Sequence, residues 1–392
     1  MYGMPNPQIL IEELDGLPII LSLLKKMDII SLIDNIFIPH KNWSGLSVGE
    51  TVAIWLGYII SHHDHRMCSV ENWVEKRHQI LSDFFGHPVS PKHFTDDRLA
   101  RILDYFSNSE RWNEFECQLN ATIIRVYGVF SNLVRIDMTT ANIDGIVTES
   151  GLVQFGHSKD DPNTPQIKVA LSVLDPLGMP LTVSIHPGNT ADDPLYIPVM
   201  NSVMKSVTDQ RLLFVGDCKM CAFAIRFHAF LHQMDYLCPL SEVAHPTQEI
   251  MDAIHTFESS NGILSPIRRK YYNGDEAIIA ETFEKKVMRS VTEKGIQHSW
   301  EERIIYARSF AHAEKQKAQI DSKLENSIIH IISMNERGRG KPVYRSRAEA
   351  EEKIQSILKT NSVLGLISYE IQEIVTKKTV RAYGNRPQRV EK

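Results

Sequence analysis

The chain has 392 residues, which is too long for one ordinary domain, so two or three domains are expected. Hydrophobic residues make up 43% and charged residues 23%, a composition that excludes an intrinsically disordered chain. The longest apolar runs are too short to span a membrane, and no basic stretch precedes the first of them as in a signal peptide. We therefore expect a cytoplasmic protein without a membrane partner, and the five cysteines favour free thiols over a disulfide framework.

The net charge of −5 hides an asymmetry along the chain. Residues 262–392 carry 25 Lys and Arg against 17 Asp and Glu, whereas residues 1–261 carry 18 against 31. A basic region at one end of an acidic chain is a known, weak indication of nucleic-acid binding. Basic surfaces also occur simply because they keep proteins soluble, so this signal alone does not decide the partner.

Residues 1–128 are expected to form an all-helical N-terminal domain. Ser47 has the position of a helix N-cap, and Glu50 lies at the capping-box distance of a helix that should run to about Ser61. A long helix is expected from Thr95, where two aspartates follow at the positive end of the helix dipole. The pattern contains no convincing strand before residue 129.

Residues 129–243 show a different pattern, with short β-like runs separated by turn residues. An antiparallel meander followed by β-α-β units is the order of strands in an RNase H-like fold, so we expect a mixed-sheet core of this type, in the α+β or α/β class. The expected elements are a strand ending at Asp137, a hairpin over 145–156, strands over 166–175 and 181–185, a helix from Asp192, a strand ending at Asp217, a helix over 222–233 and a strand over 236–240.

Two of these apolar runs end on an aspartate, at Asp137 and at Asp217. Open α/β sheets place ligands at the carboxyl ends of their strands. Two carboxylates on neighbouring strand ends can share a hard divalent cation, and such a site suits metal-assisted phosphodiester chemistry. The alternative is that each aspartate only caps a strand or opens a turn.

Several segments of this region resemble insertion-sequence transposases of bacteria and archaea, which belong to the DDE superfamily and share their catalytic core with retroviral integrases. The resemblance rests on the segments 136–140, 156–160, 165–166, 186–192 and 215–217, with a departure at 161–165, where many relatives have Arg-Pro-Asp. By this resemblance Asp137 and Asp217 match the first two catalytic acids and would bind Mg²⁺, with Mn²⁺ as a substitute. It also implies DNA partners (transposon ends and target), a homo-oligomer, and a helical domain that binds the ends or pairs subunits.

The third acid of such a triad is a Glu on a late helix, marked in the family by Tyr-x-x-Arg-x-x-x-Glu. Tyr344, Arg347 and Glu351 match this signature, but the following Lys is displaced by one position, to Lys359. A β-like stretch follows, where long apolar helices are expected. We therefore interpret residues 244–392 as the family's insertion, with the core-closing helix missing, and the chain as an incomplete transposase. Two alternatives stay open: Glu351 is the third acid, or the chain is an inactive DNA-binding or partner-binding remnant.

Three further motifs admit other chemistry. Cys218 and Cys221 have the spacing of a redox pair, but no second such pair exists to complete a zinc site. The run 62–65 contains three histidines, yet consecutive helical residues point in different directions, so a helix-end role is favoured. The basic loop 337–341 is suited to binding phosphates, or is only a solvated turn.

Overall fold

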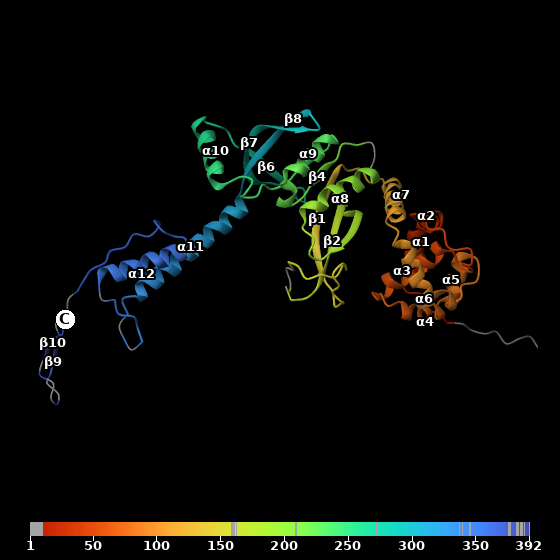
Figure 1. Cartoon of the computed structure of the whole chain (residues 1–392), viewed down its shortest axis with the longest axis horizontal. Coiled ribbons are helices and arrows are strands. Elements are labelled where there is room, and N and C mark those ends of the chain that lie inside the picture. Colours follow the sequence, from red (N-terminus) through yellow and green to blue (C-terminus); the bar gives the residue numbers. More distant parts are fainter. Residues whose placement is uncertain are drawn as a thin grey trace, which may run out of the picture. The chain divides into compact units, whose positions relative to one another are not determined.

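The computed structural model describes residues 11–157, 161, 163–207, 210–271, 273–336, 338, 340–344, 346–374, 378–381, 384, 387 and 389–391. The chain forms two compact units, Met1–Thr247 and Gln248–Lys392. The first unit contains a helical region followed by a mixed parallel and antiparallel sheet, as the sequence predicts (Figure 1). The expected boundary between these two parts, at residue 128, stays a prediction.

The helical region is built from amphipathic helices around one apolar core. In α1, for example, Leu17, Leu21 and Leu24 recur on one face and are buried. The long helix expected from Thr95 is instead two helices, because the side chain of Asn108 accepts from Arg111 N and starts a new helix. The elements are α1 (Leu17–Lys26), α2 (Ile29–Ile36), α3 (Val48–His62), η1 (Met67–Ser69), α4 (Val70–Glu75), α5 (His78–Phe85), η2 (Pro91–Phe94), α6 (Asp96–Phe106) and α7 (Ser109–Tyr127).

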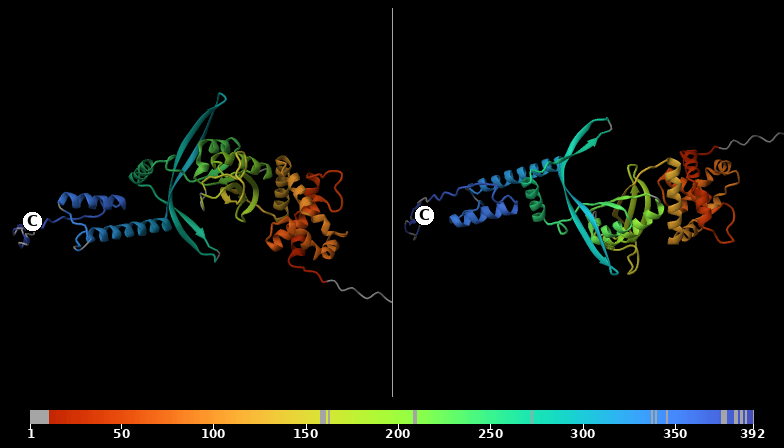
Figure 2. Two further views of the ribbon diagram at one scale, coloured as in Figure 1. Left: turned by 60° about the horizontal axis from the view of Figure 1, so that its bottom comes forward. Right: turned by 90° about the horizontal axis from the view of Figure 1, so that it is seen from above.

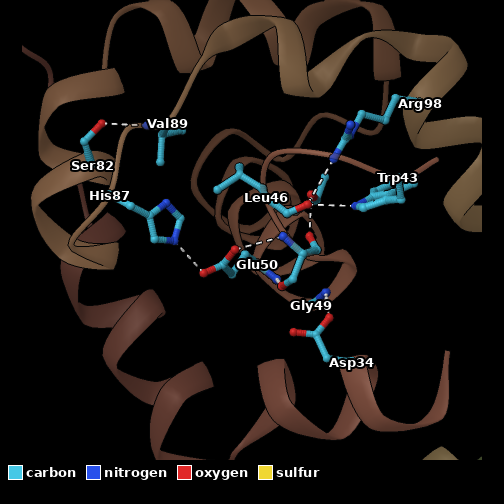
Figure 3. A network of polar contacts seen from close by, with 11 residues as sticks. Asp34, Trp43, Leu46, Gly49, Glu50, Ser82, His87, Val89 and Arg98 are labelled. Atoms are coloured by element: carbon cyan, nitrogen blue, oxygen red, sulfur yellow. Dashed lines mark hydrogen bonds and ion pairs between the residues drawn. The ribbon is translucent and has the colours of Figure 1, made fainter. Parts of the chain in front are cut away.

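The start of α3 is fixed by the capping box that the sequence predicts. Ser47 Oγ accepts a 3.0 Å hydrogen bond from Glu50 N, and Glu50 Oε2 accepts one of 2.9 Å from Ser47 N. The second oxygen of Glu50 lies 2.8 Å from His87 Nε2, and Gly49 N donates to Asp34 Oδ1 at 2.7 Å (Figure 3). Three separate segments are thereby joined at one helix terminus.

The loop before α3 is held by its own polar contacts (Figure 3). The Leu46 carbonyl accepts from Trp43 Nε1 at 2.8 Å and from Arg98 Nη2 at 3.0 Å. The Arg98 guanidinium also stacks on the Trp43 ring, with its carbon 3.9 Å from the ring centroid. The Leu46 carbonyl is thus paired twice, by side chains on either side of it in the sequence.

The sheet of the first unit has the strand order β3-β2-β1-β4-β5. β1, β2 and β3 form an antiparallel meander, and β1, β4 and β5 run parallel, which is the order expected of an RNase H-like core. Its elements are β1 (Leu133–Asn142), β2 (Gln166–Leu174), β3 (Met179–Pro187), α8 (Asp193–Ser206), β4 (Leu213–Val215), η3 (Cys218–Cys221), α9 (Phe223–Leu231) and β5 (Asp235–Leu237).

The hairpin expected over 145–156 is wrong. The described residues 143–157 form no strand, apart from an isolated bridge between Gln154 and Gln166. The side chain of Gln154 donates to the carbonyls of Thr148 and Gly151, so the segment closes on itself as a loop instead of pairing along its length.

The two faces of this sheet differ. The inner face packs against α8 and α9 and holds the core, while α7 runs along the free edge of β3, where Asn120 Nδ2 donates to Leu181 O at 2.6 Å. The strand register assigns Val183, Ile185 and Leu237 to the outer face. These three side chains are 41%, 53% and 50% exposed, so the outer face keeps apolar groups in solvent.

The second unit begins with α10 and a three-stranded antiparallel sheet in the order β6-β7-β8. β6 pairs with β7 only as far as Thr282, so beyond it β7 and β8 continue as a two-stranded ribbon (Figure 2). Lys294 and Gly295, both with positive φ, form its tight turn. The sequence did not predict this ribbon. The bounds are α10 (Thr247–Ser259), β6 (Ser265–Lys270), β7 (Glu276–Glu293) and β8 (Ile296–Ser309).

The rest of the second unit contains α11 (Phe310–Ser333) and α12 (Arg347–Thr360), which lie side by side (Figures 1 and 2). The strand-like pattern over 363–380 is wrong for residues 363–374, which the structure describes without a strand. Their apolar side chains, such as Ile367 and Tyr369, pack against the α11–α12 cluster instead. Among the residues described after 374, β9 (Lys378–Val380) pairs with β10 (Arg389–Glu391).

Candidate metal centre

Asp137 lies in the middle of β1, on the face of that strand that points away from the core. The strand expected to end at Asp137 continues to Asn142, because the residues after the aspartate stay paired with β2. Val134, Ile136 and Met138 are buried on the inner face, and the alternation leaves Asp137 exposed on the other. Its Oδ1 accepts a 2.9 Å hydrogen bond from Met138 N, which fixes one oxygen of the carboxylate. The side chain is therefore presented to solvent from a rigid strand.

Asp217 follows β4, which is the parallel neighbour of β1. Leu133 aligns with Leu213, and Arg135 aligns with Val215. Two further residues along each chain lead to Asp137 and Asp217, which therefore come at the same level of adjacent strands. The expectation that β1 and β4 are adjacent strands of one mixed sheet is confirmed, with Asp137 inside β1 and Asp217 two residues beyond the end of β4. That the two carboxylates are close enough to share an ion, and that they are metal ligands, stays a prediction.

The Asp217 carboxylate is held through one of its oxygens. Oδ1 accepts a 2.7 Å hydrogen bond from Tyr196 Oη and a 2.8 Å bond from Lys219 N, at the start of η3. Among the residues that the structure describes, none donates to Oδ2 of Asp217 or of Asp137. Each aspartate thus has one oxygen engaged with the protein and one oxygen open to a ligand.

Tyr196 connects the two carboxylates electrostatically. It lies on α8, is 1% exposed, and has a raised pKa, first because of burial and then because its hydroxyl donates to Asp217. The negative charge of Asp137 raises the same pKa further, so both aspartates act on this hydroxyl. The sequence analysis did not identify Tyr196. The signal that could have found it is a tyrosine hydroxyl on the apolar face of the helix expected from Asp192, because a buried hydroxyl needs a hydrogen-bond partner.

Gly216, the residue before Asp217, lies where the neighbouring side chains leave no room for a Cβ. A Cβ at this position would lie 2.6 Å from Met220 Sδ and 2.9 Å from Tyr196 Cε1. Carbon atoms do not approach so closely without displacement, so the chain needs glycine here. The close packing also fixes the ring that donates to Asp217.

The donor set fits a small divalent cation. Carboxylate oxygens are the ligands that Mg²⁺ and Mn²⁺ prefer, and both aspartates have an open oxygen at the same level of the sheet. In the described part of the chain, no group of three or more His, Cys, Asp and Glu side chains is placed to hold a metal ion. The pair could therefore offer two protein ligands to such a cation.

Glu351, the candidate third acid, is exposed on α12 in the second unit. The other residues of its signature have visible local roles, since Tyr344 packs against the α11–α12 cluster and Arg347 begins α12. Glu351 as third acid stays a prediction. Arg337 and Arg339 of the basic loop lie outside the described residues, and Lys341 pairs with Glu336 at 2.5 Å.

The structure also places the two competing motifs. Cys218 is exposed, Cys221 is buried, and both are free thiols. His62 Nδ1 accepts from Trp73 Nε1 at 3.1 Å, and His63 ends α3 in the left-handed conformation. These contacts agree with the helix-end role favoured for the run 62–65.

Comparison with known proteins gives one family match and several distant structural matches. Residues 9–117 match the model of a domain of unknown function, DUF4277, which covers less than half of the chain. No curated protein matches the sequence. In the described residues, no helix is both long enough and apolar enough to cross a membrane.

The solved structures with similarity include transposases bound to DNA. The piggyBac transposase synaptic complex with hairpin DNA is 9% identical, with a TM-score of 0.30, over 62% of this chain and 54% of that chain. The Mos1 mariner paired-end complex with Mn is 11% identical, with a TM-score of 0.22, over 60% and 72%. Endonuclease V of Ciona intestinalis, in complex with DNA, is 12% identical, with a TM-score of 0.19, over 45% and 76%. Similarity at this level carries no argument about function.

Proposed function

We propose that this chain is a DNA transposase of the DDE type, in an incomplete form, whose core performs metal-dependent phosphodiester cleavage and strand transfer. The observation that carries the proposal is the pairing of Asp137 with Asp217. Asp137 lies in β1 and Asp217 follows β4, its parallel neighbour in a sheet of order 3-2-1-4-5, and each carboxylate has one open oxygen. The sequence resemblance to insertion-sequence transposases supports the same reaction.

In this proposal Asp137 and Asp217 hold Mg²⁺ or Mn²⁺ through their open oxygens. When bound, the cations supply Lewis-acid activation of a water or a 3′-hydroxyl and neutralise charge on the leaving oxygen. The protein holds both carboxylates in place for this task. A backbone amide fixes Oδ1 of Asp137, and a backbone amide and the Tyr196 hydroxyl fix Oδ1 of Asp217. Their exposure on a strand face allows a DNA backbone to approach.

Two observations support an incomplete core. The outer face of the sheet, which carries Asp137, leaves Val183, Ile185 and Leu237 about half exposed, as expected if a further element normally covers it. Two aspartates also supply only two negative charges, which is little to hold two dications against their mutual repulsion. A downstream helix with a glutamate would remedy both deficits.

DNA would be bound by the basic second unit. In β6 the side chains of Arg268, Arg269 and Lys270 are exposed, and Arg268 and Lys270 have no ion pair within the described residues. Cations of this kind bind phosphates and release counterions, which makes affinity dependent on salt. The acidic N-terminal helical region is better suited to pairing subunits than to covering a phosphate backbone.

The second candidate function retains binding without catalysis. A chain with two of three carboxylates still offers its basic unit to DNA or its helical region to a full-length partner. The presence of two carboxylates in place of three supports this candidate as well. The cleavage test distinguishes a transposase from a protein that only binds.

The test uses the 392-residue chain with DNA carrying transposon ends. We expect binding without cleavage in Mg²⁺ or Mn²⁺, and cleavage once the reading frame downstream of Lys392 is restored with its Tyr-x-x-Arg-x-x-x-Glu helix. Asp137→Asn and Asp217→Asn in the restored protein should abolish cleavage. Cutting by the 392-residue chain itself, lost in Glu351→Gln and kept in Glu349→Gln, would instead make Glu351 the third acid.

The site of DNA binding is tested by charge reversal. The double variant Arg268→Glu with Lys270→Glu should weaken DNA binding. The dependence of log affinity on log salt concentration should also become less steep, by the amount that the loss of about two phosphate contacts causes. Lys286→Glu is the control, because Lys286 already pairs with Glu301 at 2.9 Å. Unchanged affinity and slope in the β6 variant would remove this strand from the interface.

A further inference from the structure

Tyr196 carries a buried hydroxyl that packing alone does not explain. Its ring is 1% exposed among the apolar side chains of α8, and phenylalanine would fill the same space. Its hydroxyl donates a 2.7 Å hydrogen bond to Asp217 Oδ1, and the missing Cβ of Gly216 lets the ring lie close to the chain before Asp217. The geometry indicates that the hydroxyl acts on Asp217.

The hydrogen bonds on Asp217 decide which oxygen a cation can use. Oδ1 accepts from Tyr196 Oη and also from Lys219 N at 2.8 Å. A carboxylate oxygen has two lone pairs, so these two donors occupy Oδ1 fully. Asp217 can then bind a cation through Oδ2 alone.

We propose that Tyr196 is a positioning residue that restricts Asp217 to coordination through one oxygen and thereby makes the site selective for Mg²⁺ or Mn²⁺ over Ca²⁺. The inference rests on the metal site of the proposed function. Ca²⁺ takes six to eight oxygens and commonly uses both oxygens of a carboxylate, whereas Mg²⁺ requires an octahedral shell and uses one or two carboxylates together with water. A carboxylate with one blocked oxygen meets the second requirement and not the first.

The test measures metal binding by the full 392-residue chain, without DNA. Binding of Mn²⁺ is followed by the electron paramagnetic resonance signal of the free ion, and binding of Ca²⁺ by its competition with Mn²⁺. Tyr196→Phe keeps the ring and removes the hydroxyl. Loss of a residue that orients a metal ligand commonly costs 10–100-fold in affinity, so we expect the Mn²⁺ dissociation constant to rise about 10-fold. The Ca²⁺ dissociation constant should stay the same or fall, because Oδ1 becomes available.

Tyr58→Phe is the matched control. Tyr58 is another buried tyrosine, 2% exposed on α3 in the helical region, and its change should leave both constants unaltered. Equal weakening of Mn²⁺ and Ca²⁺ in Tyr196→Phe, or no change in either, would overturn the proposal. If that variant does not fold, the unmodified chain still decides, since equal affinities for Mn²⁺ and Ca²⁺ contradict it.

The result is separable from the test of the proposed function. Tyr196→Phe could change the selectivity between Mn²⁺ and Ca²⁺ in a protein that does not cleave DNA even with the downstream segment restored. That combination would support the inference about Tyr196 and reject the transposase function. An Asp217→Asn chain that binds Mn²⁺ as well as the unmodified chain would reject the metal site itself.

Discussion

The carboxylate of the capping box in the helical region and the two aspartates of the sheet use their oxygens in opposite ways. In the helical region, Glu50 uses both carboxylate oxygens, one for Ser47 N and one for His87, and the Leu46 carbonyl accepts twice. In the sheet, Asp137 and Asp217 each leave one oxygen open, and one face keeps apolar side chains in solvent. The first arrangement serves stability, whereas the second leaves groups available for a ligand or a further element.

The largest expected effect concerns the closed core of the helical region. Phe37 is 0% exposed and packs edge-on against Phe106, with ring centroids 4.7 Å apart. Phe37→Ala should lower the free energy of unfolding by about 3–5 kcal/mol, because it leaves a cavity. Phe130→Ala is the control, since Phe130 is 94% exposed and should change stability by less than about 0.5 kcal/mol. Chemical denaturation measures both; similar losses would mean that the core is not the stabilising feature.

The next largest effect is expected at the candidate metal centre, where a substitution should change both stability and metal binding. Gly216→Ala introduces a Cβ against Met220 and Tyr196, and overpacking of this kind costs about 1–3 kcal/mol. Mn²⁺ binding should weaken as well, because Asp217 is displaced. Gly16→Ala serves as control, since nothing lies within 4 Å of the added carbon. A Gly216→Ala protein with unaltered stability and metal binding would show that the packing at this turn is loose.

A smaller effect is expected at the capping box. Glu50→Ala removes the acceptor for Ser47 N and the partner of His87, and loss of a helix cap costs about 0.5–2 kcal/mol. Glu110→Ala, in the first turn of α7 without such a box, should cost less. Thermal unfolding of the two variants compares them. Equal losses of stability in the two variants would mean that Glu50 acts only through its negative charge near the helix N-terminus, and not through the capping box.

The smallest effect lies where the two regions meet. Burial raises the pKa of Glu116 on α7 above the ordinary value of 4.5 for a glutamate, although Val183 N donates to this carboxylate from β3. A group with a raised pKa in the folded state contributes stability below pH 4.5 that is lost as pH rises through the folded pKa. Glu116→Gln, which keeps an acceptor, should remove this loss when unfolding is measured between pH 4 and 7. The exposed Glu114→Gln is the control; identical pH profiles for all three proteins would contradict the prediction.

Local patterns in the sequence were sufficient for the all-helical character of the first region and for the meander, although not for the break between α6 and α7. The capping box of Ser47 and Glu50 is a short-range signal, and the turn after Asp175 separates two clearly alternating runs. The aspartates were also recognisable, because each ends an apolar run. Their common level on adjacent strands followed from the order of elements between them.

The features that the sequence did not reveal depend on distant partners. The β7–β8 ribbon mixes charged and apolar residues without a clear periodicity, and its cross-strand pairs, such as Glu281 with Arg308, become visible only once the register is known. Tyr196 is similar to any buried aromatic residue until its hydroxyl is placed against Asp217. The 363–374 segment alternates like a strand, but its apolar side chains pack on helices instead.

The parallel pairing of β1 with β4 also has a consequence for the order of folding. Helices and the β1–β2–β3 meander involve residues close in sequence, whereas Leu133 must find Leu213 after the intervening chain has been ordered. Closing so long a loop costs entropy before the contact repays it, so pairing of this kind comes late. We therefore expect the two carboxylates to be assembled late in folding, so that Mn²⁺ binding through both would report a completed sheet.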